Sequence, residues 1–327
     1  MGQRAADETE QQVRAGVRGG GGDQDAPGET VAPVQDDSRG ILHPAAAHTI
    51  FHLDRFPSTG AAARFVDRYW LSTWNLPPGV RHEQQVLVHP VVNVVFEAHG
   101  AVVSGVDTGR FATVLEGSRR ALGVMFRPAA FAPFLDAPLN TLTDKELPLS
   151  AVPALAGLEP LLVPLVADLD VPAEQLAATA DAAMAERAPQ ARQPCETTTE
   201  WAELAVRDRG LSRVEDLANA VGVGVRTLQR AFTEHIGIGP KWFLRRYRIY
   251  EAAERVAHQE RVDWSELAAD LGYADQAHLT RDFTAAFGLP PAQYAAVSAA
   301  RRGAGPGGGA NSGDGAEPAD AAGDGTV

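Results

Sequence analysis

The side chains with the clearest binding chemistry in this sequence stand in two short phrases, VRTLQRAF at residues 225–232 and QAHLTRDF at residues 276–283. Arginine carries a planar fork of hydrogen-bond donors, and glutamine places a donor beside an acceptor, so each can bond two neighbouring atoms at once. The candidate binding residues are Arg226, Thr227, Gln229, Arg230, Gln276, His278, Thr280 and Arg281. Such a set suits a partner that presents paired donors and acceptors on flat edges.

Both phrases belong to a longer pattern that the chain carries twice. Its matching positions are Leu217 and Leu267, Gly222 and Gly272, Leu228 and Leu279, Arg230 and Arg281, Phe232 and Phe283, Gly237 and Gly288, and Pro240 and Pro291. The offset is 50 residues up to the glycine of the turn and 51 after it, so the second turn has gained one residue. A repeat at a fixed period indicates one supersecondary unit used twice.

Each copy predicts two short helices joined by a tight glycine turn. Apolar residues recur at three- and four-residue steps before each turn, as on one face of a helix. They are Leu211, Val214, Leu217, Ala218 and Val221 in the first copy and Trp264, Leu267, Ala268 and Leu271 in the second. Gly222 and Gly272 stand where a left-handed C-terminal cap belongs. Asp275 is a good N-cap for the helix that follows, and Gly224 is a weaker one at the corresponding place.

Helix, short turn and helix is the helix-turn-helix pattern, whose second helix enters the major groove of DNA. There, arginine can bridge guanine O6 and N7, and glutamine can bridge adenine N6 and N7. Residues 241–259, between the copies, predict a connecting helix. Its basic start holds Lys241, Arg245, Arg246 and Arg248. About 17 helical residues span roughly 25 Å, against roughly 34 Å between successive groove faces. One chain could therefore place both recognition helices on one face of a duplex.

Residues 200–298 resemble the DNA-binding domain of the AraC/XylS family, two helix-turn-helix units joined by a linker helix. The resemblance rests on LQRAF and LTRDF and on the closing phrases GIGPKWF at 237–243 and GLPPAQY at 288–294. Gly224, where the family often has a serine or threonine cap, and Ala277, where a longer polar side chain is common, depart from the pattern. The resemblance implies a bacterial protein that binds double-stranded DNA, is not an enzyme and needs no cofactor. The N-terminus has no signal-peptide apolar core, so a cytoplasmic protein is expected. RNA polymerase and a second copy of the chain are candidate partners.

The net negative charge of the chain is unusual for a protein that is expected to bind DNA. The formal net charge is −13 with a pI of about 5.1, but residues 195–302 hold 14 basic and 15 acidic side chains. A near-neutral DNA-binding domain must segregate its charges, with arginine on the recognition and linker faces. Few counterions are then released per copy, so non-specific affinity is expected to be weak. The composition favours a specific regulator over a chromatin-type protein.

The N-terminal half is rich in valine and predicts a small β-barrel or sandwich. Residues 84–107 predict strands, with Pro90 forcing an edge or a bend and a hairpin turn at His99–Gly100. Further strands are predicted at residues 111–116 and 120–127. Residues 63–74 are predicted as a short helix, or as a helix that passes into a strand.

This half resembles the N-terminal domain of one subgroup of AraC-type regulators, a cupin-like module of the DUF6597 type. The phrases that carry the resemblance are Arg68-Tyr69-Trp70, PVVNVVF at 90–96 and GVMFRP at 123–128. The resemblance implies that this domain senses an effector or joins two copies of the chain, and it leaves the ligand unknown. The expected fold class is α+β: a small β-barrel, cupin-like domain with helices, then an all-α tandem helix-turn-helix domain.

Composition divides the chain into six segments. Residues 1–40 and 299–327 are expected to be disordered tails, because they cannot bury enough apolar surface to order. The cupin-like domain spans residues 41–150, a helical extension 151–188, a linker 189–199 and the DNA-binding domain 200–298. The two amphipathic helices expected in the extension fit equally a cover for the barrel and a dimer contact, and their periodicity leaves both open.

Catalytic and metal chemistry find less support. The histidines and the glutamate near the predicted strands lack the His-x-His spacing of a cupin metal site, so no metal is expected. They are His82, Glu83, His89 and His99. Cys195 is the one cysteine of the sequence and lies in the predicted linker, where Pro194 and Glu196 do not favour a thiolate. No catalytic residue is expected.

The remaining expectations concern ligands and location. Five aromatic side chains could line a pocket for an apolar or aromatic ligand, or could instead form ordinary core. The candidates are Tyr69, Trp70, Trp74, Phe96 and Phe126. The sequence contains no run of about 18 apolar residues, so no membrane span is expected.

We therefore predict a sequence-specific transcriptional regulator of the AraC type, modulated by a small-molecule effector or by dimerisation through its N-terminal domain. One alternative is an enzyme, metal-dependent or repair-type, fused to a DNA-binding module. Another is a constitutive DNA binder whose N-terminal domain is purely structural. The two alternatives differ from the main prediction in what the N-terminal domain binds.

Overall fold

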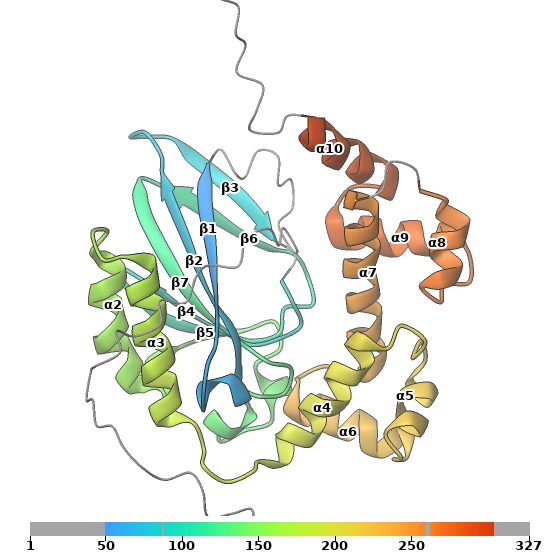
Figure 1. Cartoon of the computed structure of the whole chain (residues 1–327), viewed down its shortest axis with the longest axis horizontal. Helices are drawn as coiled ribbons and strands as arrows, with labels where there is room; N and C mark the ends of the chain where they lie inside the picture. Colours follow the sequence, from blue (N-terminus) through green and yellow to red (C-terminus); the bar gives the residue numbers. More distant parts are fainter. Residues whose placement is uncertain (1–49, 87, 259–261, 304–327) are drawn as a thin grey trace, which may run out of the picture. The chain divides into compact units, whose positions relative to one another are not determined.

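The computed structural model describes residues 50–86, 88–258 and 262–303, all of them within one compact unit of the chain. They form an antiparallel β-domain with covering helices, followed by an all-α domain (Figure 1), which is the expected α+β order. No helix among these residues is long and apolar enough to cross a membrane. The tails predicted at residues 1–40 and beyond residue 303 lie outside the described residues.

The described part of the β-domain contains eight strands. They are β1 (Phe51–Pro57), β2 (Val66–Asn75), β3 (Arg81–Val86), β4 (Asn93–Glu97), β5 (Gly100–Ser104), β6 (Phe111–Glu116), β7 (Ser118–Phe126) and β8 (Glu146–Pro148). Six form one antiparallel sheet in the order β1-β2-β7-β4-β5-β8, and β3 pairs with β6 in a second sheet. The predicted β-rich fold is confirmed in its sandwich-like form, with Pro90 in the break between β3 and β4.

Strand β2 shows why the larger sheet has two different faces. Successive side chains of a strand point to opposite faces. Tyr69 and Leu71 are accordingly buried in the main apolar core, whereas Trp70 and Ser72 stand half-buried on the other face. The first face is closed by helices, and the second faces the β3–β6 sheet.

The same strand corrects the helix predicted at residues 63–74. Residues 66–75 are strand β2, and only the turn at Ala62–Arg64 before it is helical. The alternative of a helix that passes into a strand is therefore confirmed. A strand with apolar residues on both faces loses its strict alternation, and its pattern then also fits a helical period.

Helices α2 (Glu159–Ala167) and α3 (Ala173–Arg187) cover the sheet face that carries Tyr69 (Figure 1). Arg120 of β7 holds the C-terminal end of α2, because its Nε donates to the Val166 carbonyl at 3.0 Å and its Nη1 to the Val171 carbonyl at 2.7 Å. The first bond satisfies a carbonyl that the end of α2 leaves unpaired, and the second holds the segment that follows the helix. The covering role of the extension is thus confirmed, and its role in dimerisation stays a prediction.

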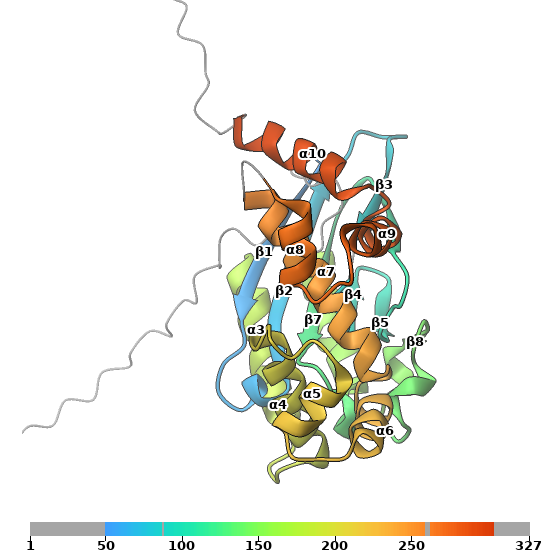
Figure 2. The same cartoon turned by 90° about the vertical axis from the view of Figure 1, so that its right-hand side faces the viewer.

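The all-α domain consists of helices that share one long element. They are α4 (Pro194–Arg207), α5 (Val214–Ala220), α6 (Val225–His235), α7 (Pro240–His258), α8 (Trp264–Asp270), α9 (Gln276–Phe287) and α10 (Pro291–Gly303). The start of α7, with Phe243 and Leu244, packs into a first core with α4, α5 and α6. The rest of α7, with Ile249 and Val256, packs into a second core with α8, α9 and α10 (Figure 2).

Two predicted boundaries differ from the structure. Helix α4 begins at Pro194, inside the predicted linker 189–199, because proline suits the first turn of a helix and Gln193 with Glu196 forms a capping box. The Glu196 carboxylate accepts a hydrogen bond from the Gln193 amide at 2.6 Å. Helix α10 continues to Gly303, so residues 299–303 of the predicted tail are helical.

Short 3-10 helices complete the β-domain and link its strands to α2. They are η1 (Ala62–Arg64), η2 (Ala132–Phe134), η3 (Leu139–Thr141), η4 (Leu149–Ala151) and η5 (Ala156–Leu158). Of these, η3 packs beside α6 of the following domain.

Candidate DNA-binding interface

The first helix-turn-helix unit consists of α5, a turn over residues 221–224 and α6. Leu228 and Phe232 of α6 are fully buried beside Leu217 of α5. Gly222 has a φ of +70°, the left-handed conformation predicted for this cap. Gly224 precedes α6 without a side-chain cap, so this helix begins with no help from its N-cap residue.

The second unit repeats the plan with α8, a turn over residues 271–275 and α9. Its turn is one residue longer, which is where the offset between the two copies changes from 50 to 51. Gly272 has a φ of +71°. The Asp275 carboxylate accepts a hydrogen bond from the His278 amide at 2.7 Å, so the predicted N-cap is confirmed.

The predicted binding residues lie on the accessible sides of the two recognition helices. Six are exposed, namely Arg226, Thr227, Gln229, Arg230, Gln276 and Arg281, and two are half-buried, namely His278 and Thr280. Four of them share α6 and four share α9, opposite the buried leucine and phenylalanine of each helix. The structure therefore brings each predicted set together, and their contact with DNA stays a prediction.

The exposed face of α6 borders the β-domain. Pro138 and Asn140, next to and within η3, line one open groove together with the four candidate residues of α6. The Thr143 hydroxyl donates to the Gly237 carbonyl at 2.6 Å, which fixes the turn after α6 to the segment after η3. A DNA duplex on α6 would therefore lie close to this part of the β-domain.

The exposed face of α9 stands above a buried carboxylate that the sequence analysis missed. Asp282 is 6 % exposed and forms an ion pair with Arg245 of α7. Its second oxygen lies 3.8 Å from His278 Nε2, and the His278 ring meets the Tyr273 ring edge-on at 5.1 Å. Burial and the Asp282 charge raise the pKa of Tyr273, which stays a neutral phenol. The sequence did contain one sign of this buried carboxylate. The repeat aligns Asp282 with Ala231 of the first unit, so a charged residue stands where the other copy has a small apolar one.

The basic start of α7 is only partly available to a ligand. Lys241 and Arg245 are exposed, as predicted. Arg246 is instead 7 % exposed, and its Nη2 donates to the carbonyls of Thr108 and Gly109 at 2.8 and 3.1 Å. Burial lowers the pKa of Arg246. Arg246 is buried because it points from α7 toward the loop between β5 and β6.

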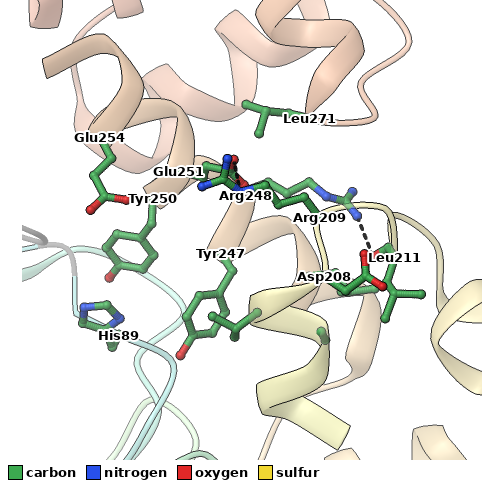
Figure 3. A pocket seen from close by; sticks show the side chains of 13 residues that line it. His89, Asp208, Arg209, Leu211, Tyr247, Arg248, Tyr250, Glu251, Glu254 and Leu271 are labelled. Carbon is green, nitrogen blue, oxygen red and sulfur yellow. Dashed lines mark hydrogen bonds and ion pairs between the residues drawn. The ribbon is translucent and has the colours of Figure 1, made fainter. Parts of the chain in front are cut away.

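A small polar pocket of about 180 Å³ lies beside α7 (Figure 3). His89 enters it from the β-domain and stacks on Tyr250, with ring centroids 4.5 Å apart and planes at 13°. The Arg209 guanidinium pairs with Glu251 at 2.8 Å. The Arg248 guanidinium donates to the Leu211 carbonyl at 3.1 Å. These charged groups of the pocket therefore already have protein partners.

Metal and thiol chemistry are not prominent in the described residues. They contain no group of three or more His, Cys, Asp and Glu side chains placed to hold a metal. Cys195 lies buried in α4 instead of in an open linker. Burial, with a smaller contribution from the Glu196 charge, raises the pKa of the Cys195 thiol to about 11. The thiol is therefore protonated at neutral pH and is a poor nucleophile.

Comparisons with known proteins match both domains. Residues 54–148 match a family described as a domain of unknown function (DUF6597), and residues 217–296 match one described as a helix-turn-helix domain. A protein of Streptomyces lividans described as an AraC-like transcription regulator is 33% identical over 81 residues, 25% of this chain and 26% of that protein. The chain carries an AraC-type helix-turn-helix domain behind a DUF6597 domain.

The AraC-type domain also aligns with the lactose operon transcription activator of Staphylococcus xylosus, 28% identical over 81 residues, 25% of this chain and 29% of that protein. The chain thus matches less than a third of the length of either curated relative. The solved structure of apo ToxT K231A from Vibrio cholerae is 11% identical, covers 74% of this chain and 99% of that chain, and has a TM-score of 0.36. Both resemblances stated from the sequence, AraC-type and DUF6597-type, are confirmed.

Proposed function

We propose that the protein is a sequence-specific DNA-binding transcriptional regulator, in which α6 and α9 enter successive segments of the major groove. The observation that carries the proposal is the doubled accessible face, with four hydrogen-bonding side chains on each recognition helix of an AraC-type domain. Helix α7 joins the two units with 19 residues, a length of roughly 28 Å. That length is of the same order as the roughly 34 Å between groove faces.

The side chains suggest a division of roles along each helix. Arg230 and Arg281 occupy the same position of the two units and are suited to guanine edges. Gln229 and Gln276 are suited to adenine edges. Arg226, Thr227 and Thr280 are suited to phosphate oxygens as well, and such contacts set the register of the protein on DNA without reading sequence.

We further infer that the N-terminal domain modulates DNA binding, either through a small-molecule effector or through dimerisation. A cavity of about 220 Å³ lies between the two sheets of this domain, and His89 and Phe111 are part of its lining. His89 stacks on Tyr250 of α7, and the loop before Phe111 accepts hydrogen bonds from Arg246 of α7. An occupant of the cavity would touch two segments that contact the linker helix, and it could shift the population of DNA-competent arrangements.

The proposal is tested by selecting bound fragments from bacterial genomic DNA with the purified full chain at physiological salt. We expect one enriched motif with two short blocks separated by about one helical turn. A protein that enriches no motif, alone and with a metabolite panel, would not be a sequence-specific regulator.

Each alternative function predicts a different result. A constitutive binder would enrich the same motif with unchanged affinity across the metabolite panel. An enzyme fused to a DNA-binding module would bind a metal in defined stoichiometry or turn over a substrate. The described residues favour neither metal nor thiol chemistry, so the regulator is the function that the site supports best.

A further inference from the structure

The cavity of the β-domain has a defined architecture. Its floor is the face of the six-stranded sheet that points away from α2 and α3, and the β3–β6 sheet forms its roof. Strand alternation sends Trp70 and Trp74 to this face and Tyr69 to the opposite one. Of the five aromatic residues predicted to line a pocket, the two tryptophans do so, whereas Tyr69, Phe96 and Phe126 belong to the helix-covered core.

Trp70 forms a flat platform on this floor. Its register partner on β7 is Gly123, and a Cβ at that position would lie 1.8 Å from the indole ring. The indole therefore lies across the bare backbone of Gly123, where any other residue would displace it. The indole Nε1 donates to Asn93 Oδ1 at 3.2 Å, which fixes the ring in its plane. One ring face rests on the sheet, and the ring borders the cavity.

The surroundings of this platform are mainly apolar. Val95 and Met125 flank Trp70 on the floor, and Val86 and Phe111 reach the cavity from the roof. Phe51, Trp74 and Leu115, which also line the cavity, form one packed cluster. A ring system inserted above Trp70 would thus meet aromatic surface below and aliphatic or aromatic side chains above, which is the environment that stacked rings prefer.

The charged side chains of the lining give no preference for an ion. Arg55 and Arg68 are balanced by Glu97 and Glu146. Arg68 also pairs with Asp67 at 2.6 Å. The volume of about 220 Å³ exceeds the roughly 150 Å³ of a cavity that holds one benzene ring. The space therefore suits an uncharged molecule of one or two rings.

We propose that this cavity binds an uncharged, planar aromatic molecule of one or two rings, which stacks on the Trp70 indole. As an effector site the cavity rests on the proposed function, but binding itself requires no DNA. Asn93 and Ser104, which are register partners at one end of the cavity, supply hydrogen-bonding groups for a polar substituent. Gly123 is the residue that makes the platform flat.

The test compares a planar probe with its saturated analogue on the full chain without DNA. Isothermal titration calorimetry with 2-naphthol is expected to show one site per chain. Decahydro-2-naphthol has the same carbon frame and hydroxyl but no aromatic face, and we expect it to bind about three- to tenfold more weakly. Equal affinities would overturn stacking as the basis of recognition, and no binding of 2-naphthol would overturn the site.

Variants locate the binding in this cavity. Trp70→Leu is expected to weaken 2-naphthol about tenfold and to abolish the preference over the saturated analogue. Gly123→Ala should do the same, because its methyl group displaces the indole. Trp70→Phe keeps a smaller ring and should keep part of the preference. Trp264→Phe, in α8 of the other domain, is the matched control and should change nothing.

The variant results separate this proposal from the proposed function. An unchanged preference in a folded Trp70→Leu protein would contradict the platform, even if DNA selection succeeds. If Gly123→Ala does not fold, Trp70→Leu and Trp70→Phe still decide the matter. If 2-naphthol binds as expected but no DNA motif is enriched, the proposed ligand site is supported and the proposed function as a sequence-specific regulator is contradicted.

Discussion

The two helix-turn-helix units share their backbone plan and differ in what supports the recognition helix. In both, a leucine and a phenylalanine of the second helix are buried at the same spacing, and a left-handed glycine ends the first helix. Helix α6 begins at uncapped Gly224 and borders η3 of the β-domain. Helix α9 is capped by Asp275 and tied to α7 through Asp282. The shared positions build the unit, and the differing positions decide how each helix is held.

Because the two recognition helices are held differently, we expect the two units to respond to different perturbations. The first unit depends on packing against α4 and on its contact with the β-domain, through Thr143 and Gly237. The second unit depends on a charge pair between Asp282 and Arg245. Changes in the β-domain should therefore reach α6 first, and changes in salt should affect α9 first.

The largest effects should fall equally on both units. Phe232 and Phe283 are fully buried in the two separate cores, so each change to alanine should cost about 3–5 kcal/mol of local stability. Hydrogen exchange on the full chain should show lost protection in the mutated unit alone. Lost protection in both units from either change would show that the two cores unfold as one and would break the comparison.

The next effect concerns DNA. Arg230→Ala and Arg281→Ala should each weaken binding to the selected site by about 1–3 kcal/mol, because each removes a base-reading side chain from one recognition helix. Arg207→Ala, an exposed arginine on α4, is the matched control. Titrations on the selected site and on random DNA check the prediction. Equal losses of affinity on the selected site and on random DNA would show that these arginines contact phosphates and do not read bases.

A smaller effect separates the units by charge. Asp282→Asn keeps the shape but removes the charge that faces Arg245, and we expect a loss of about 1 kcal/mol in the second unit. The loss stays modest because the Arg245 side chain is 54% exposed and screened by water. Asp270→Asn should cost less, because the Asp270 side chain is itself 54% exposed and its partner Arg255 keeps a second ion pair with Glu251. Chemical denaturation at low and high salt measures both variants, and an Asp282→Asn loss no larger than that of Asp270→Asn would remove the charge distinction.

The smallest effect separates the units by pH. His235 at the end of α6 is half-buried, its Nδ1 lies 2.8 Å from the Thr198 hydroxyl, and its partial burial lowers its pKa below the usual 6.5. The unfolded chain then takes up a proton more readily, so stability is complete above pH 6.5 and falls as the pH drops through the lower folded pKa.

His235→Gln should flatten this fall. Thermal unfolding between neutral and mildly acidic pH compares it with the unchanged protein, and hydrogen exchange assigns the effect to the first unit. Identical pH slopes for the two proteins would show that His235 does not titrate in this range.

The repeat made the α-domain readable from the sequence. The helices begin at Val225 and Gln276, 51 residues apart, as the matched phrases require. Gly222, Gly272 and Asp275 are local signals, since each acts on its own helix end, and all three take their predicted roles. Contacts between residues that are far apart in the sequence could not be predicted from it. The pair of Asp282 with Arg245 joins residues 37 positions apart, and no local pattern marks it.

The β-domain shows the same limit more strongly. Its strand at residues 111–116 was predicted with the observed bounds. The platform in the cavity, however, requires the register that places Trp70 on Gly123, and this register is set by sheet pairing across half the domain. Arg246 was predicted on a basic face and is buried because a loop of the β-domain meets it. The periodicity of an element marks its apolar face, but which distant segment covers a polar residue such as Arg246 follows from tertiary packing.

The most direct test of the central claim is a base-by-base comparison of the selected DNA site for Arg230→Ala and Arg281→Ala. If α6 and α9 read adjacent groove segments, each variant loses sequence preference in one of the two blocks and keeps it in the other, and the affected blocks differ. Loss of preference across both blocks in each variant, or in neither, would contradict the account that the two units read two segments of one site.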